Sequence, residues 1–161
     1  MPFFVRTGKR LERKMTEISL AFRSVPYNLI ETTAEPPGKD ALTFRVQPDE
    51  GISIHFHAKC PGPVVRVAPV EMSFTYSDLS GESRSTGYET LLYDCMVGDS
   101  MLFHRADMIE AAWSIATPIL RAWEAEPPAD FPNYAAGTWG PACAEQLITR
   151  DGRAWVQPRP G

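Results

Sequence analysis

The hydrophobic pattern of this chain changes its period half-way along, and that change limits the folds it can adopt. Between residues 16 and 78, apolar and polar residues alternate in short runs, a period typical of half-buried strands. From residue 88 onward, apolar residues recur at a helical spacing of about 3.6 residues. A set of strands followed by a set of helices predicts an α+β fold, with helices packed against a sheet.

The strand half is divided by turn signals into several candidate strands. They cover residues 2–6, 18–22, 42–47, 51–59 and 65–78, the last as one strand or two. Pro48-Asp49-Glu50-Gly51 predicts a hairpin, and the sequence EPPGKDA at 35–41 predicts a turn. Because parallel neighbours need a crossover of a dozen or more residues, these short connections predict a mainly antiparallel sheet.

The helical half predicts three helices. The first runs from Tyr88, with Gly98 as its stop signal. The second begins at Asp107 as N-cap and reaches residue 120, and Pro118 is expected to kink or split it. A long loop rich in proline, glycine and aromatic residues follows, and Pro141 is expected at the first position of a short third helix.

Composition excludes several classes of protein. The 161 residues suit one domain, and 43% hydrophobic residues are enough to build a core. A net charge of −4 argues against general nucleic-acid binding, and no apolar run is long enough to span a membrane. Three cysteines without a CxxC pair predict no disulfide framework. The N-terminus becomes cationic too early for a signal peptide, so a cytoplasmic location is expected.

Positive charge is concentrated in one short segment. Residues 6–14 contain five basic side chains and one acidic side chain, whereas the rest of the chain is acidic. Gly8 permits close approach of the backbone, and the ammonium groups of Lys9 and Lys14 suit phosphate oxygens. The segment therefore predicts a site for a small anion, with a merely solvated basic turn as the alternative.

Two histidines raise the question of a metal. His55 and His57 are two residues apart on a predicted strand, so both side chains point to one face. No third ligand stands nearby at a recognisable spacing, so a solvated strand face is expected and no metal site is predicted. The chain also has no GxGxxG, GxxxxGK[ST] or GxSxG motif, and the sequence identifies no catalytic residue.

Longer segments of the sequence resemble a known family. In order over residues 2–155, PFFVRTGKRL, FRVQPDEGI, AKCPGP, PVEMSFTYSD, YETLLYDCMVGD, LFHRADMIEAAW and YAAGTWGP resemble the C-terminal part of the glucose-6-phosphate dehydrogenase family. This family oxidises glucose 6-phosphate to 6-phosphogluconolactone with NADP in the pentose phosphate pathway. Its coenzyme loop, its RIDHYLGKE-like segment and its general-base histidine have no match here. The resemblance implies that residues 1–161 form a partial C-terminal domain without a coenzyme-binding domain, inactive in isolation.

The resemblance also assigns roles to individual residues. Lys9 and Lys14 match positions that contact the sugar phosphate, and Gln47 matches a position near the substrate. Arg6 and Arg45 match parts of a second, structural NADP site found in some members. Met15 replaces a cation used at that site.

Partners follow from the same resemblance. The family's sheet forms a dimer contact, so the chain is expected in a homo-oligomer or with a chain that carries the N-terminal half. The alternative is a non-catalytic module that complements or modulates a separately encoded dehydrogenase chain. An incomplete sheet is expected to expose an unpaired edge and apolar surface.

Overall fold

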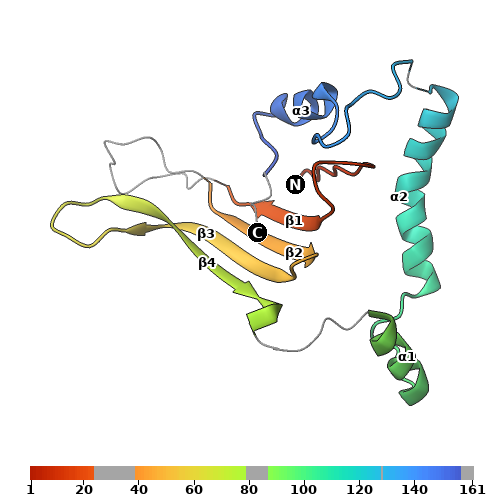
Figure 1. Cartoon of the computed structure of the whole chain (residues 1–161), viewed down its shortest axis with the longest axis horizontal. Helices are drawn as coiled ribbons and strands as arrows, with labels where there is room; N and C mark the ends of the chain where they lie inside the picture. Colours follow the sequence, from red (N-terminus) through yellow and green to blue (C-terminus); the bar gives the residue numbers. More distant parts are fainter. Residues whose placement is uncertain (24–38, 79–86, 128, 157–161) are drawn as a thin grey trace. The chain divides into compact units, whose positions relative to one another are not determined.

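The computed structural model describes residues 1–23, 39–78, 87–127 and 129–156, so most of the turn expected at 35–41 lies outside the described residues. The chain divides into two compact units, residues 1–81 with 134–161, and residues 82–133. The first unit contains a four-stranded sheet and one helix, and the second contains two helices (Figure 1). The predicted α+β class is confirmed.

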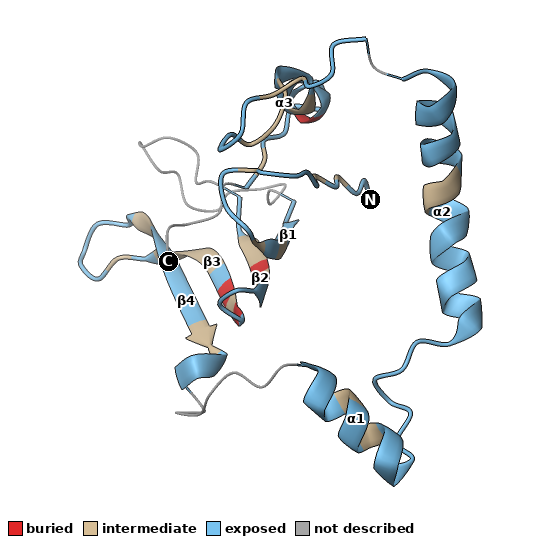
Figure 2. Cartoon of the chain, turned by 45° about the vertical axis from the view of Figure 1, so that its right-hand side comes forward, coloured by how far each residue is buried: buried red, intermediate tan, exposed pale blue. Residues whose placement is uncertain are grey.

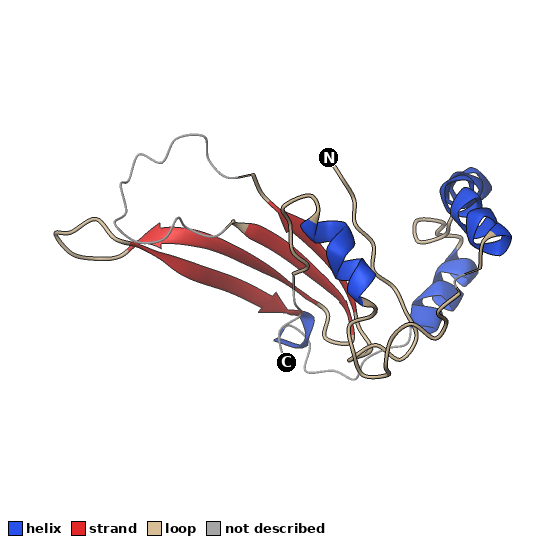
Figure 3. Cartoon of the chain, turned by 90° about the horizontal axis from the view of Figure 1, so that it is seen from above, coloured by secondary structure: helices blue, strands red, loops and turns tan. Residues whose placement is uncertain are grey.

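The sheet is antiparallel throughout its described strands. These are β1 (Thr16–Ala21), β2 (Ala41–Gln47), β3 (Gly51–Lys59) and β4 (Val67–Thr75), in that spatial order (Figure 1). Figure 3 shows the strands in red, side by side in one sheet. A short 3₁₀ turn, η1 (Tyr76–Asp78), follows β4. The hairpin predicted around residues 48–51 joins β2 to β3. The strand expected at 2–6 is wrong, because that segment joins no ladder among the described residues.

One face of the sheet carries a row of hydroxyl groups. Ser19, Thr43, Ser53 and Ser73 are direct cross-strand partners, one from each strand. The hydroxyls of Ser19 and Thr43 are 3.2 Å apart, and Thr43 and Ser53 are buried. Because side chains alternate along a strand, Arg45, Gln47 and both strand histidines share this hydroxyl face.

The opposite face is apolar and largely open. Its residues include Ile18, Leu20, Ile54 and Met72, all exposed, and Met72 is 61% exposed. The pale blue that prevails in Figure 2 marks how much of the described chain is exposed. Among the described residues, Ile148 is the hydrophobic side chain that is buried. The core expected from composition is therefore not formed within the described part of the chain, whereas the expected exposed apolar surface is present.

The helices of the second unit differ in detail from the prediction. α1 (Gly87–Val97) ends as predicted at Gly98, which has a φ of +76°. α2 (Ala106–Ala125) has Arg105 as its N-cap, and Asp107 lies in the first turn, where its carboxylate accepts the Met108 N–H. An acidic group there complements the helix dipole whether or not it is the cap.

Pro118 does not split α2, which continues for seven residues beyond it. A proline removes one N–H donor, but the flanking turns keep the helix intact. The apolar stripe of α2 is exposed within its unit, since no residue of α1 or α2 is buried. No described helix combines the length and apolarity needed to cross a membrane.

α3 (Ala142–Thr149) belongs to the same unit as the sheet. Pro141 is its N-cap, with extended backbone, and not its first helical residue as predicted. Ile148 of this helix is buried, and the indole N–H of Trp155 donates to the Ala144 carbonyl at 3.2 Å. The segment after α3 thus folds back along the helix.

Candidate functional site

The cationic segment is a loop whose backbone is fixed by residues 134–138. The Tyr134 hydroxyl donates to the Lys9 carbonyl at 2.6 Å, and the Gly137 N–H donates to the Arg10 carbonyl at 2.9 Å. The Glu12 N–H donates to the Thr138 carbonyl at 3.2 Å. These three hydrogen bonds fix the backbone of residues 9–12 in one conformation. The side chain of Lys9 is nevertheless exposed.

Gly8 is needed for this arrangement. A Cβ at this position would lie 2.9 Å from the Tyr134 hydroxyl and 3.2 Å from a Leu11 methyl carbon. The sequence predicted close approach at Gly8 to a ligand, whereas the structure shows close approach to Tyr134. The glycine therefore serves to shape the loop.

Arg6 contacts two tryptophans. Its guanidinium carbon is 4.8 Å from the ring centroid of Trp139 and 4.7 Å from that of Trp155. Trp155 also meets the edge of the Phe4 ring at 6.3 Å. Cation–π stacking of this kind fixes the segment that leads into the cationic loop.

Arg6 also carries donors for a ligand. Its guanidinium has five N–H groups and stays charged, which suits phosphate oxygens. The role of Arg6 at a structural NADP site stays a prediction.

Arg45 lies across the start of β3. Its Nη2 would be 2.7 Å from a Cβ added at Gly51, so the glycine makes room for the guanidinium. Its Nε is buried and has no hydrogen-bond partner. A buried donor without a partner is costly, and an acceptor at this point would remove that cost.

Gln47 lies beside the C-terminal end of the cationic segment. It ends β2 opposite Thr16, and its amide nitrogen donates to the Thr16 hydroxyl at 2.9 Å. Thr16 comes two residues after Lys14, so the register brings Gln47 beside the end of the loop. Lys9, Lys14 and Gln47 are all exposed.

The strand histidines are paired with carboxylates. His57 Nδ1 is 2.9 Å from Asp40 Oδ1, and His55 Nε2 is 3.5 Å from Glu71 Oε1. Both imidazoles are half-buried, so the expected solvated strand face is wrong. The cross-strand register places Glu71 opposite His55, which the local sequence could not reveal. Within the described ranges, no group of three metal-ligating side chains occurs.

Comparison with known proteins decides the family. A family model described as glucose-6-phosphate dehydrogenase, C-terminal domain, matches residues 1–156. The chain belongs to the glucose-6-phosphate dehydrogenase family. Among the relatives of this family, glucose-6-phosphate 1-dehydrogenase of Chlamydia pneumoniae is 44% identical over 158 residues, which cover 96% of this chain and 31% of the relative. The enzyme of Aggregatibacter actinomycetemcomitans is 45% identical over 158 residues, covering 98% and 31%.

Solved structures of the family share the fold. Glucose-6-phosphate 1-dehydrogenase from Mycobacterium avium superposes with a TM-score of 0.70 at 30% identity, covering 96% of this chain and 31% of that one. A glucose-6-phosphate dehydrogenase in complex with its substrate glucose 6-phosphate gives a TM-score of 0.75 at 27% identity, covering 93% and 30%. The chain thus spans about a third of the length of the relatives it matches.

Proposed function

We propose that this chain is the C-terminal portion of a glucose-6-phosphate 1-dehydrogenase and supplies one wall of its substrate site. The whole enzyme would oxidise glucose 6-phosphate to 6-phosphogluconolactone with NADP. The observation that carries the proposal is the fixed backbone of the cationic loop at residues 9–12, in a chain that matches the family over residues 1–156. A phosphate dianion needs positive charge at a defined place, and this loop provides it.

Each site residue has a distinct proposed task. The ammonium groups of Lys9 and Lys14 bind the phosphate oxygens as point charges and need no bidentate geometry. The Gln47 amide donates to Thr16 and keeps its carbonyl oxygen as an acceptor for a sugar hydroxyl. Holding the phosphate end in this way orients the reacting carbon, which accelerates the reaction through positioning.

The hydride acceptor and the general base are assigned to other parts of the enzyme. Bound NADP would accept the hydride from the sugar. The described sheet is antiparallel, whereas dinucleotide-binding folds use parallel βαβ units. Where a structural NADP is present, Arg6 and Arg45 are the residues proposed to contact its phosphates. We place the assembled protein in the cytoplasm, as a homo-oligomer or with a chain carrying the N-terminal half.

A split-enzyme assay tests the proposal. The chain would be co-expressed with the part of the Chlamydia pneumoniae relative that it does not match, and reduction of NADP by glucose 6-phosphate would be followed. We expect activity only when both parts are present. We also expect Lys9→Ala to raise the KM for the sugar phosphate and leave the KM for NADP unchanged. An unchanged KM for the sugar phosphate would contradict the proposed role.

The open apolar face of the sheet favours a second candidate function, that of a non-catalytic assembly module. Ile54 and Met72 on that face are exposed, and so is much of α2. Such a module would bind a separately encoded dehydrogenase chain without taking part in the reaction. In the split-enzyme assay, complex formation without activity would support this function and contradict the first.

A further inference from the structure

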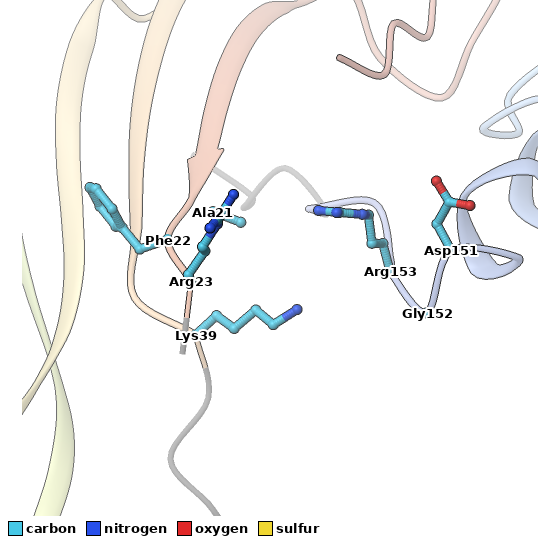
Figure 4. A pocket seen from close by; sticks show the side chains of 7 residues that line it. All are labelled: Ala21, Phe22, Arg23, Lys39, Asp151, Gly152 and Arg153. Atoms are coloured by element: carbon cyan, nitrogen blue, oxygen red, sulfur yellow. The ribbon is translucent and has the colours of Figure 1, made fainter. Parts of the chain in front are cut away.

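A small cationic pocket lies between the end of β1 and the turn after α3 (Figure 4). It has a volume of about 230 Å³ and is lined by Ala21, Phe22, Arg23, Lys39, Asp151, Gly152 and Arg153. We refer to these residues as the β1–α3 pocket. It shares no residue with the proposed sugar-phosphate site, so it requires a separate explanation.

The charges in the β1–α3 pocket are unbalanced. Three cations and one carboxylate line it, although the whole chain has a net charge of −4. In Figure 4, the side-chain ends of Lys39 and Arg153 point toward each other across the gap, and the Asp151 carboxylate points away from it. In the described part of the chain, neither of these cations nor Arg23 forms a salt bridge.

The turn at residues 151–153, after α3, forms one wall of the pocket and is fixed by backbone hydrogen bonds. The N–H groups of Asp151 and Arg153 donate to the Ile148 carbonyl at 3.2 and 3.3 Å, and that of Gly152 donates to the Thr149 carbonyl at 2.9 Å. Because these backbone donors are already used, a ligand would be bound by the side chains. The Arg153 guanidinium carbon is 5.9 Å from the Phe4 ring centroid, and the guanidinium carries five N–H donors.

Like charges that converge without a partner repel one another, and an anion between them removes that cost. An arginine fork suits two oxygens of one phosphate, and a lysine adds a third donor as a point charge. In Figure 4 the Phe22 ring points away from Lys39 and Arg153, so the charged side chains alone would recognise a ligand. We propose that the β1–α3 pocket is an anion site that binds a phosphate group, either free or on a small organic phosphomonoester.

Titration of the full chain with phosphate tests the proposal. Backbone amide NMR shifts would be followed while inorganic phosphate, and separately phenyl phosphate, is added at constant ionic strength. We expect the largest shifts at residues 21–23, 39 and 151–153. Tighter binding of phenyl phosphate would identify an organic phosphate as the ligand class, and equal binding would identify free phosphate.

Variants separate this site from the sugar-phosphate site. Arg153→Gln and Lys39→Gln should each weaken phosphate binding about tenfold, the loss expected for one charge-assisted hydrogen bond. Lys9→Ala with Lys14→Ala, and Arg121→Gln on exposed α2, are the controls that should leave the pocket's affinity unchanged. If Arg153→Gln disturbs the fold, its spectrum will show shifts throughout the chain. In that case the phosphate affinity of Lys39→Gln alone tests the proposal. Absence of shifts at the pocket up to about 20 mM phosphate, or equal affinity in all variants, would overturn the proposal.

Discussion

The Tyr134 hydroxyl donates a hydrogen bond to the Lys9 carbonyl at 2.6 Å, across 125 positions of sequence. This bond joins the loop proposed to bind the sugar phosphate to a segment that carries no charge of its own. The lysine side chain is exposed, and its position depends on the backbone beneath it. The two residues together explain how an exposed loop can offer a defined binding position.

Tyr134→Phe should loosen the loop while retaining the aromatic ring. Loss of one hydrogen bond predicts a decrease of about 0.5–1.5 kcal/mol in the free energy of unfolding. Amide hydrogen exchange at Glu12 and Gly137 should become faster, because their bonds lie in the same loop contact. Tyr93→Phe, at a side chain 60% exposed on α1, is the matched control and should change neither quantity.

Gly8→Ala should destabilise the same contact through crowding. The added Cβ would be 2.9 Å from the Tyr134 hydroxyl. We therefore expect urea denaturation to show a free energy of unfolding that is lower by about 1–3 kcal/mol. The variants Gly8→Ala and Tyr134→Phe should couple, with the double variant losing less than the sum of the two. Gly87→Ala, where an added Cβ meets nothing within 4 Å, is the control. Additive losses would show that the crowding does not involve Tyr134.

Arg6→Met removes the positive charge beside Trp139 and Trp155 but keeps a long side chain there. Two cation–π contacts at 4.8 and 4.7 Å predict a loss of about 1–2 kcal/mol in the free energy of unfolding. Arg6→Lys should recover only part of it, since an ammonium group has no flat surface to stack on both rings. Arg121→Met, at an exposed position of α2, should have no effect. Equal stability of Arg6→Lys and the unchanged chain would contradict a stacking role.

The apolar face of the sheet should drive self-association of the isolated chain. Ile54→Thr with Met72→Thr retains residues compatible with a strand and lowers the apolarity of the face. We expect sedimentation velocity to show concentration-dependent association of the unchanged chain and a shift toward monomer in the double variant. Val64→Thr, 65% exposed outside the strands, is the control. Association that persists in the double variant would place the contact elsewhere.

The sequence could predict the strands because their alternation is a local property. The run around Ile18 and the hairpin at Pro48–Gly51 each lie within a few residues, and both were confirmed. The expected core was not found among the described residues, because burial depends on what covers the apolar face and not on the alternation itself. Pro141 was predicted at the first helical position of α3 but is the N-cap. Sequence alone does not separate the two, because both positions accept proline.

The site was only partly predictable for a related reason. The basic run identified the loop around Lys9, but the groups that hold it, Tyr134 and Thr138, lie more than a hundred residues away. The aromatic and glycine content of YAAGTWGP was the available signal, and by itself it indicated only a loop. The pairing of His55 with Glu71 likewise required the cross-strand register.

The proposed sugar-phosphate site is tested by titrating the chain with glucose 6-phosphate and following the backbone amide NMR spectrum. We expect shifts at residues 8–14 and at Gln47, with weak binding that is lost in Lys9→Ala with Lys14→Ala and retained in Lys39→Gln. Shifts confined to other residues, or the same affinity in the unchanged chain and the double variant, would contradict it.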